Sequence, residues 1–300
     1  MPEPATRGWF RPREWVRAAW RILLFLTLFF GLALVGNLLF ARALAGLSGP
    51  AVFLGSGLVL VAALIAGAVL MRFVERRPVG ALGTAWTSRT WPEMLLGLGI
   101  GAGAIGISAL LLVATGSLRY TFEGGTVWFW LDGLLQQLWI FLVAAFAEEV
   151  VFRGYPFQVL AQTFGGVAAT LVTSAAFAVA HASNPNVATF GLINIFLAGV
   201  LLSAAYLRTR SLWFATTLHL GWNWAMASVL DLPVSGFELI DTPLYDPVVR
   251  GPAWLSGGNF GPEGGVAGAV GILAALTALF LLRQVGVAPE MTALRPLPDG

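Results

Sequence analysis

The stretch FAEEVVFR at residues 146–153 puts three charged side chains into an apolar helical run. An ionised side chain in the middle of a bilayer costs at least a few kcal/mol, so it persists where it faces a bundle interior and has a partner or a function there. Glu149 and Arg153 are four residues apart, so they share one helix face and can pair. Glu148 is rotated by about 100° from Glu149 and has no such local partner. The stretch indicates a membrane helix bundle with a functional carboxylate. The alternative is that both glutamates only fix helix packing through Arg153.

Composition supports the membrane class. Of the 300 residues 58% are hydrophobic and 11% are charged, with a mean hydropathy of +0.81. Soluble domains carry about 25% charged residues, so we expect an all-α polytopic membrane protein. The chain has no cysteine, which excludes disulfides, thiolate metal sites and a cysteine nucleophile. The basic residues are all arginines and lie near helix ends, so they indicate membrane orientation rather than nucleic-acid binding.

Apolar runs of about 20 residues predict an eight-transmembrane-helix bundle. The predicted helices cover about 18–47, 50–74, 92–118, 127 through the glutamates, 167–184, 187–207, 212–230 and 266–282. Gly154 and Pro156 are expected to bend or break the fourth helix. We divide the chain into a basic N-terminal segment (1–17), the membrane domain (18–283) with its motif-bearing core at about 136–230, and a C-terminal tail (284–300).

The arginines test this model, because cytoplasmic loops of membrane proteins carry an excess of positive charge. Most fall on one side of an eight-helix arrangement, and only Arg42, Arg119 and Arg250 fall on the other. We therefore expect both termini in the cytoplasm. The long, acidic, Gly- and Pro-rich loop at 231–265 is then expected outside, as a cap over the outer face.

One literal motif is discarded. GAGAIG at 101–106 matches the dinucleotide-binding pattern, but it lies inside a predicted membrane helix with no strand beside it. Together with Gly97 and Gly99 it places small residues four apart, which lets membrane helices approach closely. We interpret this run as a packing surface.

Few other polar side chains lie inside the predicted helices. Phe177 and His181 share one helix face, as do His219 and Asn223 on another helix, and these are the only two histidines of the chain. A lone histidine in a bundle is often a satisfied core residue, but two histidines in separate spans beside a buried glutamate pair favour a functional site. The polar residues expected to form interhelical hydrogen bonds instead are Asn194, Gln136 and Gln137.

These residue types are suited to hydrolysis. A carboxylate near a neutral histidine can deprotonate a water, and a second histidine with an amide can donate to a developing oxyanion. We expect Glu148, His181, His219 and Asn223 to converge on one cavity that opens to the cytoplasmic side. A zinc site of two histidines and a glutamate is the metal alternative, although the chain has no HExxH motif.

The motifs EExxxR at 148–153, FxxxH at 177–181 and HxxxN at 219–223, in this order in late helices, resemble the CPBP family. This family comprises the CAAX-protease and bacteriocin-processing intramembrane endopeptidases, which include the type II CAAX prenyl proteases. The resemblance covers about residues 136–230. The run GPAWLSGG at 251–258 also resembles bacterial members, which favours the bacterial plasma membrane as the location.

The resemblance implies an intramembrane glutamic endopeptidase. Glu148 and His181 would activate the attacking water, and His219 with Asn223 would form the oxyanion site. Glu149 and Arg153, with Phe177, would support the site. The implied partners are membrane lipid and a membrane-associated or transmembrane peptide or protein substrate, with no nucleic acid, no cofactor and no metal.

The alternative from another functional class is a transporter or proton-relay protein, in which the same buried groups carry protons. The sequence shows neither an inverted repeat nor a pair of broken helices, which are typical of transporters.

The arginine distribution generates a topology prediction. Reporter fusions after Arg89 and after Arg210 should both report a cytoplasmic location, and a fusion near Asp241 should report an external one, because positive loops stay inside. An external signal after Arg210 would contradict the eight-helix model.

Overall fold

The computed structural model describes residues 12–44, 51–238 and 244–299. Most of the predicted N-terminal segment and residues 239–243 of the predicted outer loop therefore lie outside the described residues. Within the described ranges the fold is helical apart from one two-stranded sheet. The expectation of a helical, polytopic integral membrane protein is confirmed.

The helices differ widely in length. In chain order they are α1 (Pro12–Leu44), α2 (Ala51–Val69), α3 (Thr90–Ala114), α4 (Val127–Arg153), α5 (Tyr155–Phe164), α6 (Gly166–Ala180), α7 (Thr189–Thr209), α8 (Leu212–Trp224), α9 (Ala253–Ser256), α10 (Val266–Leu281) and α11 (Pro289–Ala293). Single π-helical turns extend α2 (Leu70–Val74) and α8 (Ala225–Val229). The 3₁₀ turns are Val79–Leu82, Gly258–Phe260, Pro262–Gly264 and Leu297–Asp299.

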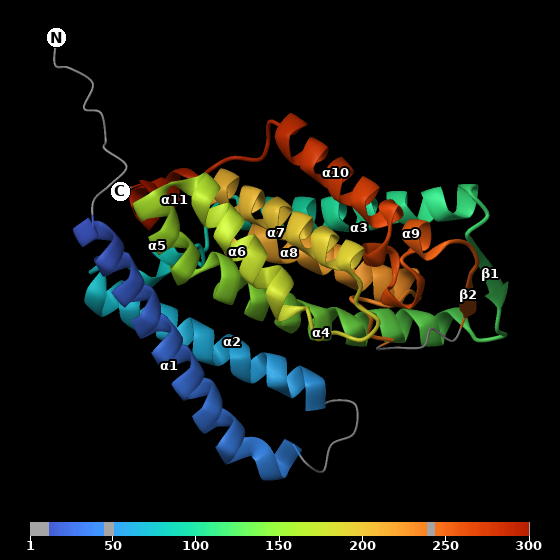
Figure 1. Cartoon of the computed structure of the whole chain (residues 1–300), viewed down its shortest axis with the longest axis horizontal. Coiled ribbons are helices and arrows are strands. Elements are labelled where there is room, and N and C mark those ends of the chain that lie inside the picture. The colour runs from blue at the N-terminus through green and yellow to red at the C-terminus, as the bar shows by residue number, and fades with distance from the viewer. Residues whose placement is uncertain (1–11, 45–50, 239–243, 300) are drawn as a thin grey trace.

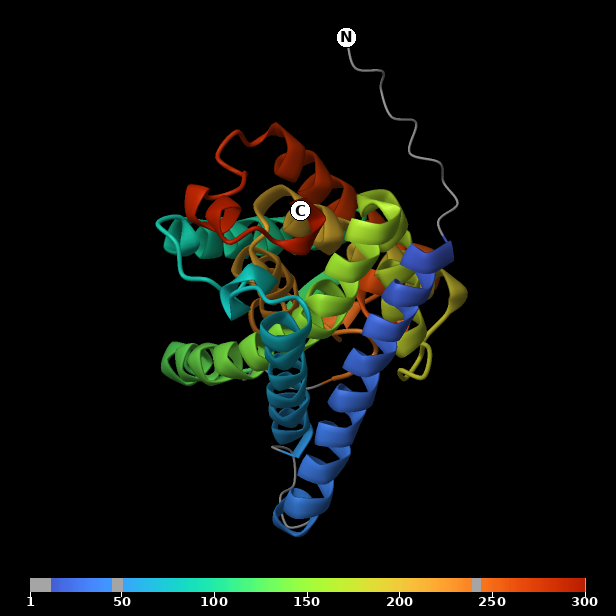
Figure 2. The same ribbon diagram turned by 90° about the vertical axis from the view of Figure 1, so that its left-hand side faces the viewer.

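The helices form a bundle with one diverging hairpin. Helices α3, α4, α6, α7 and α8 lie side by side, and α10 packs on α3 and α7 (Figure 1). Helices α1 and α2 pack on α5 and α4 near one end and then extend away from the rest (Figure 2). Strands β1 (Leu118–Phe122) and β2 (Tyr245–Val249) pair antiparallel at the opposite end of the bundle from α5 and α11. The sequence predicted neither strand.

Fewer described helices than the predicted eight have both the length and the composition of a membrane span. In the described part of the chain, five segments are long and apolar enough to cross a membrane: Arg13–Ala41, Gly55–Val74, Thr90–Ala114, Val127–Phe164 and Thr189–Thr209. The predicted fifth and eighth helices correspond to the shorter apolar helices α6 and α10. The predicted seventh corresponds to α8 with its π-helical turn. Eight spans, and the orientation of the termini, stay predictions.

The predicted break in the fourth helix is confirmed. Gly154 leaves the helical region (φ −74°, ψ −131°) between α4 and α5, and Pro156 stands in the first turn of α5. A Cβ on Gly154 would lie 2.2 Å from the Val150 carbonyl oxygen, so this change of direction requires glycine. The break places the charged end of α4 inside the bundle.

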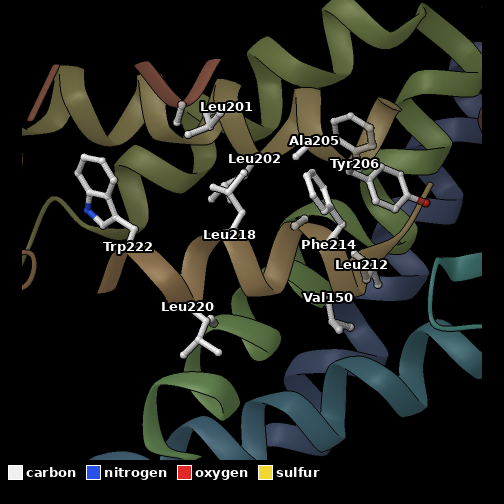
Figure 3. Close-up of a cluster of buried hydrophobic side chains, with 14 of the residues drawn as sticks. Val150, Leu201, Leu202, Ala205, Tyr206, Leu212, Phe214, Leu218, Leu220 and Trp222 are labelled. Carbon is white, nitrogen blue, oxygen red and sulfur yellow. The ribbon is translucent and has the colours of Figure 1, made fainter. Parts of the chain in front are cut away.

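Helix α8 is the centre of the bundle. Every residue from Phe214 to Trp222 is buried, which is the property of a helix surrounded by protein. On one side its apolar side chains interleave with those of α7, including Leu201, Leu202 and Tyr206 (Figure 3). Its polar residues His219 and Asn223 therefore lie inside protein rather than against lipid.

The glycine-rich run of α3 packs against α8, as the sequence predicted. A Cβ on Gly101 would lie 2.0 Å from the Leu218 carbonyl oxygen, and one on Gly221 would lie 2.3 Å from the Leu98 carbonyl oxygen. By contrast, a Cβ on Gly99 or Gly103 would meet no atom within 4 Å. Only one face of the run therefore makes the close approach.

This asymmetry gives a matched pair of variants. Gly101→Ala should destabilise the protein by roughly 1–3 kcal/mol, the usual cost of overpacking, because two backbones must separate. Gly103→Ala should leave the melting temperature unchanged or slightly raised, since alanine favours helix and the position is open. Thermal unfolding of both variants in the same detergent compares them. Equal melting temperatures would show that the α3–α8 approach is not tight.

Candidate active site

The two glutamates of α4 lie in different environments. Glu149 is fully buried, whereas the side chain of Glu148 is 37% exposed. Their difference in direction follows from adjacent positions on a helix, which point about 100° apart. Glu149 therefore faces the protein interior, and Glu148 faces a cavity.

Glu149 and Arg153 form the predicted pair. Arg153 Nη1 donates to Glu149 Oε1 at 3.1 Å, and Arg153 Nη2 donates to the Gly199 carbonyl oxygen of α7 at 3.0 Å. The guanidinium carbon lies 4.7 Å from the centre of the Phe177 ring, a cation–π distance. Both side chains of the pair are completely buried, so the guanidinium compensates a charge that water cannot reach.

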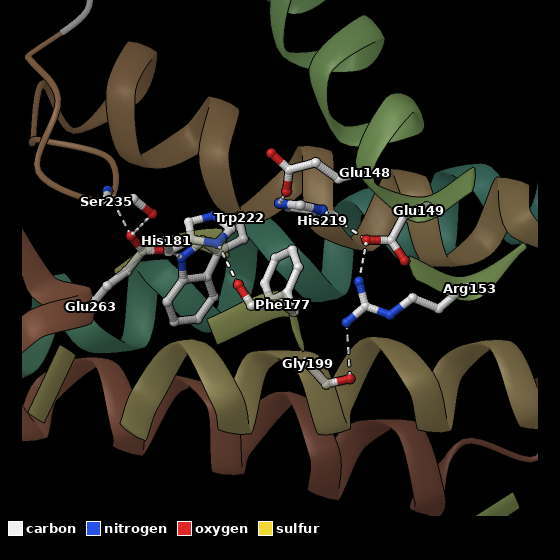
Figure 4. Close-up of polar contacts among 10 residues, drawn as sticks. All are labelled: Glu148, Glu149, Arg153, Phe177, His181, Gly199, His219, Trp222, Ser235 and Glu263. Carbon is white, nitrogen blue, oxygen red and sulfur yellow. Dashed lines mark hydrogen bonds and ion pairs between the residues drawn. The ribbon is translucent and has the colours of Figure 1, made fainter. Parts of the chain in front are cut away.

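His219 of α8 bridges the two glutamates. Its Nδ1 lies 2.9 Å from Glu149 Oε1, and its Nε2 lies 3.8 Å from Glu148 Oε2 (Figure 4). An ionised carboxylate only accepts hydrogen bonds. Nδ1 therefore carries a proton and donates a hydrogen bond to Glu149. The contact fixes the ring and directs Nε2 towards Glu148. The sequence predicts only the pairing of Glu149 with Arg153, and this second partner is not predicted from it.

His181 lies at the end of α6 rather than inside a helix. The predicted helix at 167–184 ends at Ala180, and His181 is the residue that caps it. Its Nδ1 lies 2.8 Å from the Phe177 carbonyl oxygen, which can only accept, so this nitrogen is the donor. The Phe177 ring packs at 4.5 Å from the His181 ring and at 6.1 Å from the His219 ring. The Phe177 ring thus packs against both histidine rings.

One cavity of about 390 Å³ is lined by all four predicted residues: Glu148, His181, His219 and Asn223. This volume is within the range of small-molecule and peptide side-chain pockets. Most of the other lining side chains are apolar, among them Phe141, Phe152 and Leu218. The structure therefore brings together the residues that the motifs singled out, from the two helices α4 and α8 and from the end of α6.

The cavity also contacts the predicted outer loop. Val234, Ser235, Phe237 and Glu263 line it, and all four belong to the segment 231–265. The cavity therefore lies against the segment that the arginine distribution predicts to be outside. Its opening to the cytoplasmic side stays a prediction.

Glu263 is a cavity residue that sequence reasoning missed. Its carboxylate accepts hydrogen bonds from Trp222 Nε1 and from Ser235, and its side chain is buried (Figure 4). In the sequence, this glutamate lies in the glycine-rich run GPEGG at 261–265. Such a run is equally typical of an exposed loop, so the sequence alone does not indicate a cavity residue.

The other predicted polar residues behave differently from one another. Asn194 joins α7 to the segment before α10, as expected, by donating to the carbonyl oxygens of Glu263 and Gly265 at 2.8 Å each. Gln136 donates instead to Asp132 of its own helix at 2.7 Å, so the expected interhelical bond is wrong for this residue.

The zinc alternative requires a cluster of ligand side chains. Among the described residues, no group of three or more His, Cys, Asp or Glu side chains is arranged to hold an ion. Tetrahedral zinc sites need ligand atoms about 2.0–2.2 Å from the metal. Here Nδ1 of both histidines is engaged in a hydrogen bond, which leaves only the Nε2 atoms for a ligand.

Comparison with known proteins agrees with the motifs. A family model described as type II CAAX prenyl endopeptidase Rce1-like matches residues 128–225. The match covers about a third of the chain and includes every residue of the three motifs, so it confirms the resemblance to the CAAX-protease family. No curated protein matches the sequence.

The buried pair generates a stability prediction. Glu149→Gln should lower the free energy of unfolding, by up to roughly 3–5 kcal/mol, because it leaves the guanidinium of Arg153 buried without its counter-charge. Glu148→Gln, at the neighbouring and partly exposed position, should unfold close to the wild-type temperature. Thermal unfolding in detergent measures both. A Glu149→Gln variant as stable as Glu148→Gln would show that the ion pair is not needed for the fold.

Proposed function

We propose that this integral membrane protein is an intramembrane endopeptidase of the CAAX-protease type. The observation that supports the proposal most directly is the shared cavity of Glu148, His181, His219 and Asn223. The family match to residues 128–225 favours a peptidase over the transporter or proton-relay alternative. The substrate is then a membrane-associated or transmembrane peptide or protein, since the cavity lies within a helix bundle.

Glu148 is the general base of the proposed reaction. Its carboxylate faces the cavity and accepts no hydrogen bond from a described residue, so it is free to accept one from a water. Glu148 takes a proton from the water while the water oxygen attacks the carbonyl carbon of the peptide bond. His181, with Nδ1 held by the Phe177 carbonyl, offers Nε2 as a second partner for that water.

Asn223 and His219 are the proposed donors to the oxyanion. The attack gives a tetrahedral intermediate, and the Asn223 amide and His219 Nε2 stabilise its negative oxygen. The carbon–nitrogen bond then breaks, and the departing amine receives the proton that Glu148 took from the water. No metal or cofactor is needed to balance these steps.

The bond between His219 and Glu149 sets a condition on this role. Because Nδ1 donates to Glu149, His219 can donate from Nε2 only when the ring carries both protons. The neighbouring Glu148 and Glu149 carboxylates supply negative charge on both sides of such a ring. In the singly protonated ring Nε2 would accept instead, and Asn223 would be the main oxyanion donor.

The roles are tested by substitution. Glu148→Gln keeps the shape of the side chain but removes the base, so cleavage should fall by the ~10²–10⁴-fold typical of losing a general base. Asn223→Ala should lower turnover by about 10²–10³-fold, the usual effect of removing one oxyanion donor. Comparative membrane proteomics of cells carrying wild type or Glu148→Gln identifies the substrate through the fragments that vanish.

The controls separate chemistry from folding and from metal. Both variants should reach the membrane at wild-type levels and unfold near the wild-type temperature. Purified wild type should stay active after a strong chelator, whereas a zinc enzyme would lose activity and Glu148→Gln would also lower its bound metal. Wild-type fragment levels in Glu148→Gln cells would disprove the glutamate mechanism.

A further inference from the structure

Glu263 is a buried carboxylate that the proposed chemistry does not use. It lies in the 3₁₀ turn Pro262–Gly264 just before α10, outside the matched residues 128–225. Its residue is only 7% exposed, yet it lines the same cavity as Glu148. A charged group at such a position is expensive in a membrane protein, so it indicates a function or a specific partner.

Both carboxylate oxygens of Glu263 are held by neutral donors. Trp222 Nε1 donates to Oε1 at 2.9 Å, while the backbone N–H and the hydroxyl of Ser235 donate to Oε2 at 2.7 and 2.8 Å (Figure 4). No ion pair of Glu263 is found within the described part of the chain. A glutamine has one acceptor oxygen and one donor nitrogen, so it cannot satisfy Trp222 and Ser235 together.

Trp222 connects this carboxylate to Asn223. Asn223 lies between two tryptophans whose indole N–H groups are both anchored, Trp222 to Glu263 and Trp224 to the Leu134 carbonyl oxygen of α4 at 2.9 Å. The two anchors come from different elements and flank Asn223 on the helix. They fix the rotation of α8 about its axis at this point, and with it the side of the helix from which the Asn223 side chain enters the cavity.

The end of α8 needs such anchors. From Ala225 the helix continues as a π-helical turn, in which the backbone hydrogen bonds change their spacing. Such turns are rare and are frequent at functional sites. A change of helical spacing two residues after Asn223 leaves its direction dependent on contacts from outside the helix.

Glu263 is itself held in place from two further elements. Asn194 of α7 donates to its carbonyl oxygen at 2.8 Å. On the other side, the turn around Ser235 is fixed by Asn184, which donates to the Ser235 carbonyl oxygen at 3.0 Å. Ser235 has a positive φ of 48°, an uncommon conformation that these bonds hold. Hydrogen bonds from Asn184 and Asn194 therefore hold the backbone on both sides of the carboxylate.

We infer that Glu263 is a positioning residue of the proposed active site. It orients Asn223 through Trp222, and at the same time it holds the turn 234–237 as a wall of the substrate cavity. The inference rests on the proposed function, because the group that it positions is the proposed oxyanion donor. It places part of the site in a segment that the family motifs do not include.

The test compares two tryptophans of α8. Trp222→Phe removes the indole bond to Glu263, and Trp213→Phe removes a similar bond, to the Thr84 carbonyl oxygen at 3.1 Å, far from Asn223 on the same helix. The substrate is the full-length protein that accumulates in Glu148→Gln cells. Trp222→Phe should lower kcat by about 10-fold or more with little change in KM, since the contact it disturbs acts in the transition state. Trp213→Phe should keep the wild-type kcat.

A double substitution separates positioning from general damage. In the Asn223→Ala background, Trp222→Phe and Glu263→Gln should each cause little further loss of kcat, because the group that they orient is gone. If the losses of kcat from the single substitutions multiplied in the double variants, Glu263 would act independently of Asn223, and the inference would be wrong. Equal losses of kcat in Trp222→Phe and Trp213→Phe would also overturn it.

Hydrogen–deuterium exchange gives a readout that does not need a substrate. Glu263→Gln should raise exchange in residues 219–230 and 232–237, whereas Trp213→Phe should leave both segments protected. Unchanged exchange in Glu263→Gln would overturn the inference and leave the proposed function intact. If no Glu148-dependent fragment exists, the proposed function fails, and raised exchange would then assign Glu263 a structural role only.

Discussion

A carboxylate that is completely buried in a helix bundle needs both a counter-charge and hydrogen-bond donors, and Glu149 obtains them from Arg153 and His219. The pair with Arg153 extends to α7 through the Gly199 carbonyl oxygen, and the bond to His219 extends to α8. One side chain of α4 therefore fixes the relative positions of three helices. Because His219 Nδ1 is used in this way, Nε2 is left to face the cavity. The proposed chemistry depends on the direction of Nε2. The bond between Nδ1 and the buried carboxylate of Glu149 sets this direction.

The position of α8 depends on a second constraint, which is the absence of side chains between it and α3. Gly101 and Gly221 let the two backbones approach until a single Cβ would overlap a carbonyl oxygen. Such contact is rigid, because neither backbone can move without losing its packing. It holds the helix that carries His219 and Asn223 at a fixed depth in the bundle. The anchors at Trp222 and Trp224 then determine its rotation at the point where the π-helical turn begins.

The features that were predictable from the sequence are those with a local cause. The Glu149–Arg153 pair follows from a spacing of four, the break at Gly154 from its glycine and the proline that follows, and the packing face of α3 from small residues four apart. The contact of His219 with Glu149 joins residues 70 positions apart, and no periodicity encodes it. The predicted helix at 167–184 extended beyond the end of α6 at Ala180, because hydropathy does not mark the residue at which a helix ends. The β1–β2 ribbon was missed because its two short strands are separated by more than a hundred residues.

The cavity shows that the matched residues do not form the candidate site alone. Residues 128–225 contain the three motifs, but the wall of the cavity also includes Ser56 of α2 and the turn around Ser235. Glu263, which holds that turn and Trp222, comes from the segment before α10. A motif records residues that must be chemically identical, whereas a wall can be built from many sequences provided that it is held at the right distance. For this reason the residues that we assign to the chemistry lie within the matched range 128–225. Glu263, which we assign to their positioning, lies outside it.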